Sequence, residues 1–489
     1  MIDTKLIRQK ILDLAIRGKL VPQAPSDEPA SELLKRINAE KAVLVKSGKI
    51  KKEKPLPPIS KDEIPFDIPG SWTWVRLGKL FSVVSARRVH KADWKSSGIP
   101  FYRAREIAKL AAFGFVDNEL FISQDQYEEY KQSSGAPNPG DIMVTAVGTI
   151  GKAYVVKKND VFYYKDASVI CLENCHKMNS LFFKYCFSAA FIVSQIFSKS
   201  TGTTVDTITI EKAEQYVFPL PPLAEQERIV AKVEALMNEV DTIERETENL
   251  NRTFALTREK ALDLAIRGKL VPQDPNDEPA SELLKRIQAE KIALIKSGKL
   301  KKEKPLPPIS EDEIPFDIPA SWSWVRLASL GTVVGGGTPS TSVPEYWDGA
   351  IPWLSPCDLS DYDGKYIGHG KRNISQEGLD HSSAALMPAG SILYSSRAPI
   401  GYVVIASNEI STNQGFKSLV PAIDGINEFI YYALKALTSD IKNRATGTTF
   451  KEISGSEFGK TLIPLPPLAE QKRIVKKLET IFSTLNIQV

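Results

Sequence analysis

Two stretches of the chain, roughly residues 82–200 and 332–445, carry basic and amide side chains among aromatic residues. An arginine guanidinium can donate two parallel hydrogen bonds to a guanine edge, an asparagine or glutamine amide pairs with adenine, and lysine mostly contacts phosphate. Taken singly, each such residue is more often an ordinary surface residue, so the hypothesis of DNA contact rests on the whole set. The candidates are Arg87, Arg88, Lys91, Arg103, Arg105, Lys152, Lys371, Arg372, Arg397, Asn413, Gln414 and Lys417.

Residue clusters that could perform catalysis or bind a metal do not have the spacing that such chemistry needs. Gly148, Gly151 and Lys152 lack the spacing of a phosphate-binding loop, and the following AYVV favours a strand over a helix. A zinc site built from Cys171, Cys175, His176 and Cys186 would have poor ligand spacing. The four histidines form no acid–base or nucleophile arrangement. The sequence therefore predicts a chain without catalytic residues and without a metal.

Composition indicates a protein with several domains and a local, not global, basic character. The chain has 489 residues, 42% of them hydrophobic, and a formal net charge of only +4. Four cysteines are sparse for this length, which is typical of a reducing cytoplasm. The most apolar stretch, 181–197, is interrupted by Lys184 and is expected to form one core helix and not a membrane span. We therefore expect a cytoplasmic protein without a membrane partner.

An internal repeat dominates the organisation of the chain. Residues 12–77 match residues 262–327 at 56 of the 66 positions, an offset of 250. A second pair, TGTT…PLPPLAEQ…RIV, begins at Thr201 and again at Thr446, an offset of 245. The stretches between the repeats do not align simply. The pattern indicates one scaffold, built twice, that presents two different inserts.

A long helix is predicted to follow Pro221 and Pro222, since proline suits the first turn of a helix. Its apolar residues recur at steps of four and three, the spacing of a coiled-coil seam, up to a stop at Gly268. About 46 residues would give a rod of roughly 70 Å. The C-terminal segment repeats the first half of this seam. The predicted seam residues are Ile229, Val233, Leu236, Val240, Ile243, Leu250, Phe254, Ile474, Leu478, Ile481 and Leu485.

The second copy of the rod is divided between the ends of the chain. The C-terminal segment matches only the first half of the rod, and residues 5–20 match only its second half. If the halves meet, the molecule is a closed ring with a pseudo-two-fold axis. The alternative is two tandem domains joined by an ordinary helix.

Each rod is followed by a doubled connector. A short amphipathic helix, a run of lysines at 46–54 and a pair of tryptophans lead into each insert. The lysines could contact phosphate or simply be solvated, whereas Trp72, Trp74, Trp322 and Trp324 are expected to be core anchors of the inserts. Strands are predicted in 140–156, 162–173, 390–407 and 411–420.

The expected fold is α+β, with two globular inserts joined by two long antiparallel coiled-coil regions in a pseudo-two-fold, circular arrangement. The expected division is an N-terminal repeated frame (1–75), a first insert (76–217), a central repeated frame (218–325), a second insert (326–462) and a distal half-rod (463–489).

The doubled motifs resemble the DNA-sequence specificity subunit of type I restriction–modification enzymes over essentially the whole chain. ALDLAIRGKLVPQ, DEPASELLKRI, KPLPPIS with IPFDIP, and TGTT…PLPPLAEQ…RIV carry the resemblance. It implies that each insert is a target recognition domain that reads half of a split, asymmetric double-stranded DNA site. It implies a role in host defence, without catalysis by this chain.

The resemblance also implies partners: two modification subunits that methylate adenine, and restriction subunits that cleave DNA. S-adenosylmethionine, Mg²⁺ and ATP are then cofactors of these partners and not of this chain. One alternative is a coiled-coil adaptor that binds only proteins. A second is a fused nuclease or methyltransferase that acts alone.

Overall fold

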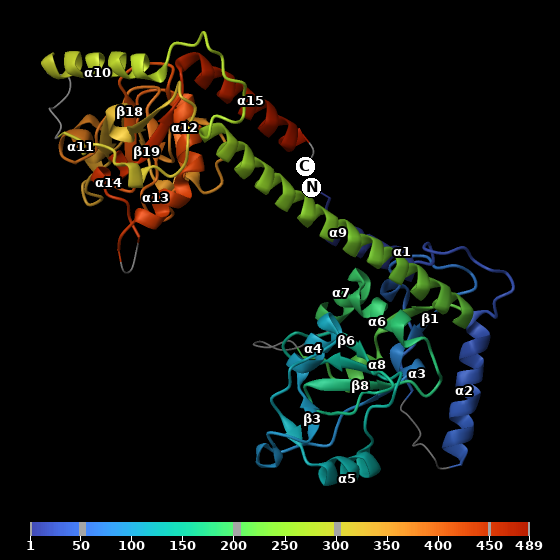
Figure 1. Cartoon of the computed structure of the whole chain (residues 1–489). Helices are drawn as coiled ribbons and strands as arrows, with labels where there is room; N and C mark the ends of the chain where they lie inside the picture. Colours follow the sequence, from blue (N-terminus) through green and yellow to red (C-terminus); the bar gives the residue numbers. More distant parts are fainter. Residues whose placement is uncertain (1, 48–54, 199–206, 298–304, 448–450, 488–489) are drawn as a thin grey trace. The chain divides into compact units, whose positions relative to one another are not determined.

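The structure is a computed structural model that describes residues 2–47, 55–198, 207–297, 305–447 and 451–487 (Figure 1). Much of the predicted lysine run and the TGTT motif of the first copy lie outside these residues. The chain divides into two compact units, Met1–Thr247 and Glu248–Val489, here called unit 1 and unit 2. The five-part division predicted from the sequence stays a prediction.

Unit 1 contains a frame of helices and a two-stranded sheet at the base of the first insert. The helices are α1 (Thr4–Ile16), α2 (Ala30–Lys46) and the first part of α9. The strands β1 (Thr73–Arg76) and β9 (Val217–Leu220) pair antiparallel, with Thr73 opposite Leu220 and Arg76 opposite Val217. Since β1 enters the insert and β9 leaves it, this small sheet closes the insert at its base.

The first insert is an α+β domain with two sheets. One sheet has the order β2–β8–β5–β6, and the other has the order β4–β3–β7. The predicted strands in 140–156 and 162–173 are confirmed. The strands are β2 (Ser82–Val84), β3 (Ile99–Tyr102), β4 (Phe121–Ile122), β5 (Ile142–Thr145), β6 (Ala153–Val155), β7 (Tyr163–Tyr164) and β8 (Val169–Glu173). The helices are α3 (Leu77–Leu80), α4 (Ala104–Phe113), α5 (Gln124–Ser134), α6 (Ser180–Ser188), α7 (Ala190–Ser198) and α8 (Ile210–Glu214).

The single core helix expected over 181–197 is wrong, because two helices, α6 and α7, meet there at 69°. Ala189 between them has an extended backbone (φ −78°, ψ 141°), which ends α6. The bend lets Phe183 and Ile192 both reach the core of unit 1. Among the described residues no single helix has the length and apolarity to cross a membrane, although this bent pair satisfies both criteria together.

Unit 2 repeats the frame. Here α10 (Ala280–Lys296) corresponds to α2, and β10 (Ser323–Arg326) pairs antiparallel with β19 (Leu462–Leu465). Ser323 lies opposite Leu465 and Arg326 opposite Leu462, which is the register of β1 and β9. The last helix, α15 (Leu468–Ile487), follows β19 as α9 follows β9.

The second insert has a different sheet arrangement, with the orders β11–β18–β15–β16–β13 and β14–β12–β17. The predicted strands in 390–407 and 411–420 are confirmed. The strands are β11 (Gly331–Gly335), β12 (Trp347–Leu354), β13 (Tyr366–Ile367), β14 (Arg372–Ile374), β15 (Ile392–Tyr394), β16 (Val403–Ala406), β17 (Ser411–Thr412) and β18 (Lys417–Pro421). The helices are α11 (Gln376–Asp380), α12 (Asn427–Ala436), α13 (Thr438–Arg444) and α14 (Gly455–Gly459).

The predicted long helix is confirmed as α9, which runs from Leu223 to Ile266 over 44 residues. It begins directly after Pro222, whose carbonyl accepts from the Gln226 amide at 3.0 Å. It ends before Gly268, whose φ of +68° is a left-handed conformation that a side chain disfavours. A Cβ at Gly268 would also lie 2.4 Å from Cγ of Pro319, so the frame requires glycine there.

The seam residues are buried or half-buried, except Leu250. Ile229, Val233 and Val240 lie in the core of unit 1 with α1, and Leu236 packs against that core. Leu250 is 43% exposed. The remaining predicted positions are buried at Phe254, Ile474 and Leu478 and half-buried at Ile243, Ile481 and Leu485.

Candidate nucleic-acid interface

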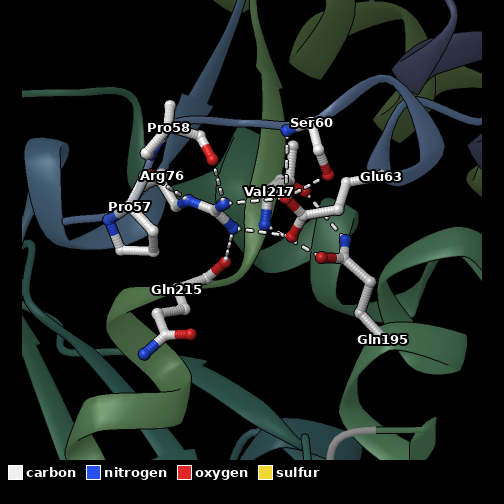
Figure 2. A network of polar contacts seen from close by, with 8 residues as sticks. All are labelled: Pro57, Pro58, Ser60, Glu63, Arg76, Gln195, Gln215 and Val217. Carbon is white, nitrogen blue, oxygen red and sulfur yellow. Dashed lines mark hydrogen bonds and ion pairs between the residues drawn. The ribbon is translucent and has the colours of Figure 1, made fainter.

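The base of the first insert is held by the buried guanidinium of Arg76, which is only 5% exposed (Figure 2). It donates to the carbonyls of Pro57 (3.0 Å) and Pro58 (2.9 Å) in the connector and to that of Gln215 (2.7 Å) just before β9. Its two terminal nitrogens also form a bidentate pair with Glu63, each at 2.8 Å. Arg76 therefore ties the connector to both the entry and the exit of the insert.

A second contact in Figure 2 fixes the insert's own helix to the same sheet. The Gln195 amide on α7 donates to the Val217 carbonyl at 2.8 Å and accepts from the Val217 amide at 2.9 Å. Both of these bonds are buried. Since Val217 starts β9, α7 cannot shift without breaking two buried hydrogen bonds.

Unit 2 has the same arginine contacts at the base of its insert, but a different side chain holds the insert's own helix. Arg326, 5% exposed, donates to the carbonyls of Pro307 (2.8 Å) and Pro308 (3.1 Å) and pairs with Glu313 at 2.9 Å. In unit 2, the last residue of α13 is Arg444, whose guanidinium donates to the Glu457 carbonyl at 2.8 Å and to Thr461 Oγ1 at 2.7 Å. The frame contact is kept while the insert contact changes.

Another buried contact joins the long helices to the tryptophan anchors. Trp72 Nε1 donates to Glu225 at 2.9 Å, and Gln23 donates to the other carboxylate oxygen at 2.5 Å. Glu470 receives the same two bonds from Trp322 and Gln273, also at 2.9 and 2.5 Å. Burial raises the pKa of Glu225 and of Glu470, although the tryptophan and glutamine bonds oppose the rise. The predicted anchoring role of the two tryptophans fits their burial, at 6% and 5% exposure.

One cavity in the first insert brings Arg105 and Lys152 together. Its volume is about 710 Å³, and its walls come from α4, from the turn at Val147–Thr149 and from α6. Small alanines on α4 open it, and Lys109 and Lys184 add two further cations that the sequence reasoning missed. Burial lowers the pKa of Lys184, and the charge of Lys157 lowers it further. A cavity rimmed by four cations suits a phosphate or a base edge.

Arg103 has a local structural role. Its guanidinium pairs with Glu106 at 2.8 Å, and Arg105 binds the same carboxylate at 2.9 Å. Burial acts to raise the pKa of Glu106, which is 2% exposed, but the bonds from both arginines outweigh it and lower the pKa to about 2. Arg105 remains 55% exposed, whereas Arg103 is 28% exposed and closes the first turn of α4. Of the two, Arg105 is the better placed to reach a ligand.

Arg87, Arg88 and Lys91 follow β2 and lie on a loop apart from the α4 cavity. Arg87 pairs with Glu129 at 2.9 Å, and its guanidinium lies 4.8 Å from the ring centre of Tyr130. Arg88 is 75% exposed and 4.0 Å from Asp166, and Lys91 is exposed. This loop therefore offers three exposed cations, of which Arg87 is the most firmly held.

In the second insert, two of the predicted cations converge on one carboxylate. Arg397 and Lys417 lie 3.6 and 3.2 Å from Glu452. Lys417 is 17% exposed, so most of its surface is used inside the protein. Asn413 Oδ1 accepts from the Gly415 amide at 2.8 Å and shapes a turn, while the exposed Gln414 contacts Thr338.

Lys371 and Arg372 lie at a different place on the second insert, at the start of β14. Arg372 lies over the ring of Trp347 at 3.7 Å, a cation–π contact that orients an exposed guanidinium. Lys371 is exposed beside it. The predicted residues of the second insert thus come from β14, from the segment after β17 and from the turn at Arg397, and those of the first insert come from the segment after β2, from the start of α4 and from the residue before β6.

One turn recurs in both inserts. Thr145 Oγ1 accepts from the Lys152 amide at 2.9 Å, and Ser395 Oγ accepts from the Tyr402 amide at 2.8 Å, 250 positions later. The turn presents Lys152 in one insert and Arg397 in the other. Among the described residues no group of three or more His, Cys, Asp or Glu side chains could hold a metal.

Comparison with known proteins agrees with this architecture. The family described as "Type I restriction modification DNA specificity domain" matches residues 69–252 and 319–488. The EcoAI specificity subunit of Escherichia coli is 31% identical over 99% of this chain and 89% of its own length. The EcoEI specificity subunit of the same organism is 35% identical over 70% of this chain and 64% of its own length.

Two solved structures share the fold. The crystal structure of the HsdS subunit from Thermoanaerobacter tengcongensis aligns with a TM-score of 0.55 at 22% identity, covering 87% of this chain and 92% of that one. A chain from a structure described as the basis of "complex assembly" of "the type I R-M system" gives a TM-score of 0.58 at 23% identity, covering 87% and 93%. The chain therefore belongs to the family of type I restriction–modification DNA specificity subunits, the component that determines sequence specificity and is not itself the enzyme.

Proposed function

We propose that the chain reads a bipartite, asymmetric DNA site, with one half read by each insert. The observation that carries this proposal is the duplicated frame: Arg76 and Arg326 make matching contacts at the bases of two unlike inserts. A frame built twice would present two binding domains in equivalent ways. Since the inserts differ in sheet order and in exposed cations, they would recognise different half-sites.

The circular arrangement is part of the same proposal, and contacts inside each unit support it. In unit 1, Arg8 on α1 pairs with Asp241 (2.6 Å) and Glu244 (2.9 Å), while Gln23 further along reaches back to Glu225. Thus α1 runs antiparallel to the first half of α9. In unit 2, α15 shares a core with the second half of α9. The two terminal helices would then complete a second rod.

A distance measurement tests the closure. Spin labels on the exposed residues Lys5 and Thr484 should lie within a few helical turns, each about 5.4 Å, because both flank the point where the second rod is divided. Pulsed electron resonance on the full chain measures this distance. A broad distribution at long distances would show that the rod is open and would support two tandem domains.

We propose that the repeated frame docks two modification subunits and that restriction subunits join them. The supporting features are the family membership and the two matching frame surfaces, including the paired contacts Asp27–Arg228 and Asp277–Arg473 at 2.5 and 2.6 Å. In this proposal S-adenosylmethionine, Mg²⁺ and ATP belong to the partners, each modification subunit methylates a flipped adenine, and the complex acts in the cytoplasm.

Exchange of one insert tests modular reading. Replacing residues 82–200 by the corresponding insert of another family member should change one half of the methylated site and leave the other half unchanged. Methylome sequencing of cells that contain the chimera and its modification partner gives the answer. A change in both halves would contradict independent reading, and the reciprocal exchange of residues 332–445 is the matched control.

A further inference from the structure

The two frames differ at one aromatic contact. In unit 1, Phe191 on α7 packs edge-on against the frame's Phe66 and Trp74, with ring centres 5.5 and 5.7 Å away. In unit 2, the corresponding Phe316 and Trp324 pack edge-on against each other with ring centres 5.0 Å apart, and no third ring of the described chain joins them.

The reason is a difference at the position of Phe191, where unit 2 has Ala436, the last residue of α12 and not a residue of α13. At the 245-residue offset, Ile196 of α7 corresponds to Ile441 of α13, and both are fully buried, at 1% and 0% exposure. The same offset places Ala436 where unit 1 has Phe191. Unit 2 therefore lacks the aromatic side chain that covers this part of the frame in unit 1.

The missing side chain leaves space. Two adjoining cavities of about 770 and 510 Å³ share Asp263, Ile266, Ala436 and Ser439 in their walls. One extends along α9 to Leu256, a leucine that is 56% exposed, and the other extends to Phe316. We call this combined space the unit 2 groove. Its walls combine charged side chains with apolar ones, among them Leu262, Ile266 and Phe316, and the apolar part suits an apolar side chain.

The charges around the unit 2 groove already have partners. Five of the six cations on its walls form ion pairs with carboxylates of the same walls, and the sixth, Lys435, donates to the Tyr431 hydroxyl at 3.0 Å, so a phosphate would have to compete with existing partners. An uncharged apolar group needs no such displacement, which favours a protein side chain over DNA as the occupant. The five pairs are Lys260–Asp263 at 2.9 Å, Arg267–Asp263 at 2.5 Å, Arg326–Glu313 at 2.9 Å, Arg444–Asp440 at 3.0 Å and Lys460–Glu457 at 2.6 Å.

We propose that the unit 2 groove receives a phenylalanine-sized aromatic side chain of the modification subunit that docks on unit 2. The occupant's chemistry follows from unit 1, where the chain fills the corresponding place with its own Phe191. This inference rests on the proposed docking of modification subunits on the repeated frame. Because the unit 1 place is occupied, the two docking surfaces are unequal, and unit 2 binds its modification subunit more tightly.

The test uses the full chain and the purified modification subunit, with stepwise binding measured by native mass spectrometry. The natural chain should bind two copies with unequal affinities. Ala436→Phe fills the groove as unit 1 does, so the tighter affinity should fall at least about tenfold, as expected when one aromatic side chain loses its burial. The matched control Ala436→Ser keeps the groove open and should bind like the natural chain.

A second variant keeps the test decisive if Ala436→Phe fails to fold. Leu256→Glu places a charge at the exposed end of the groove, away from either core, and should also weaken only the tighter affinity. Unchanged binding of both copies by the folded variants would overturn the groove proposal, as would weakening of restriction-subunit binding alone. Failure of the natural chain to bind any modification subunit would instead reject the proposed function.

Discussion

The two units share a frame whose contacts agree closely, and they differ where the frame meets the insert. The tryptophan–glutamate bond is 2.9 Å long in both units, and the glutamine–glutamate bond is 2.5 Å in both. By contrast, Gln195 and Phe191 of α7 hold the insert to the frame in unit 1, whereas unit 2 has Arg444 at the end of α13 and Ala436 at the end of α12. A frame can therefore stay constant while the insert is exchanged, provided that a few contacts at the junction adapt.

The largest expected effect comes from removing the arginine at the base of an insert. Arg76→Ala removes the cation that pairs with Glu63 and the donor to three carbonyls, which should cost about 3–5 kcal/mol of unfolding free energy. Arg326→Ala should cost less, because Glu313 is 38% exposed whereas Glu63 is 24% exposed, so water replaces the lost donor more easily. Urea unfolding of both variants of the full chain measures the difference. Equal costs would show that the two junctions are energetically the same.

The contact between Arg103, Arg105 and Glu106 provides a smaller effect with a defined pH dependence. The pKa of Glu106 is about 2 in the folded protein, against 4.5 for the unperturbed group. A lowered pKa stabilises the fold above pH 4.5, and this stabilisation is lost as the pH falls through 2, so Glu106→Gln should cost about 3 kcal/mol at pH 7. Thermal unfolding across this pH range should show the two proteins converging in acid.

The contribution of Glu225 to stability should depend on pH with the opposite sign, so Glu225 serves as the control for that experiment. Burial raises its pKa, so its contribution is fully present below its unfolded pKa and is lost as the pH rises through the folded pKa. Glu225→Gln should therefore change stability with pH in the reverse direction. A parallel response of the two variants would contradict the contrast between a carboxylate paired with arginine and one buried beside tryptophan.

The frame could be predicted from the sequence because it occurs twice. The repeat at an offset of 250 indicated the connector and the tryptophans, and the coiled-coil spacing after Pro222 indicated the long helix. The break at Ala189 could not be predicted in this way, since no glycine or proline marks it and only packing of Phe183 and Ile192 into one core requires it.

The candidate interface was only partly predictable, because single residues were judged without their neighbours in space. The spacing of Arg103 and Glu106 at the start of α4 was a local signal that could have indicated their pairing. Lys184 could not have been assigned, since α6 brings it to α4 across about 75 residues of chain. The difference between Phe191 and Ala436 could not be predicted either, because these residues lie in stretches of sequence that do not align simply.

The smallest expected effect comes from substitutions in the turn that both inserts share. Lys152→Ala removes an exposed cation from the α4 cavity, and Arg397→Ala removes a half-buried cation from the corresponding turn of the second insert, where Tyr402 takes the place of Lys152. If Lys152 contacts phosphate, its loss should weaken DNA binding by about 1 kcal/mol for all sequences and reduce the salt slope by about one. If Arg397 reads a base, its loss should relax specificity in only one half-site.

Fluorescence anisotropy with the full chain and its modification partner, over a salt series and with each half-site altered in turn, separates the two behaviours. Absence of salt-dependent DNA binding would instead favour the adaptor that binds only proteins, because binding to DNA displaces counterions and therefore weakens as salt rises.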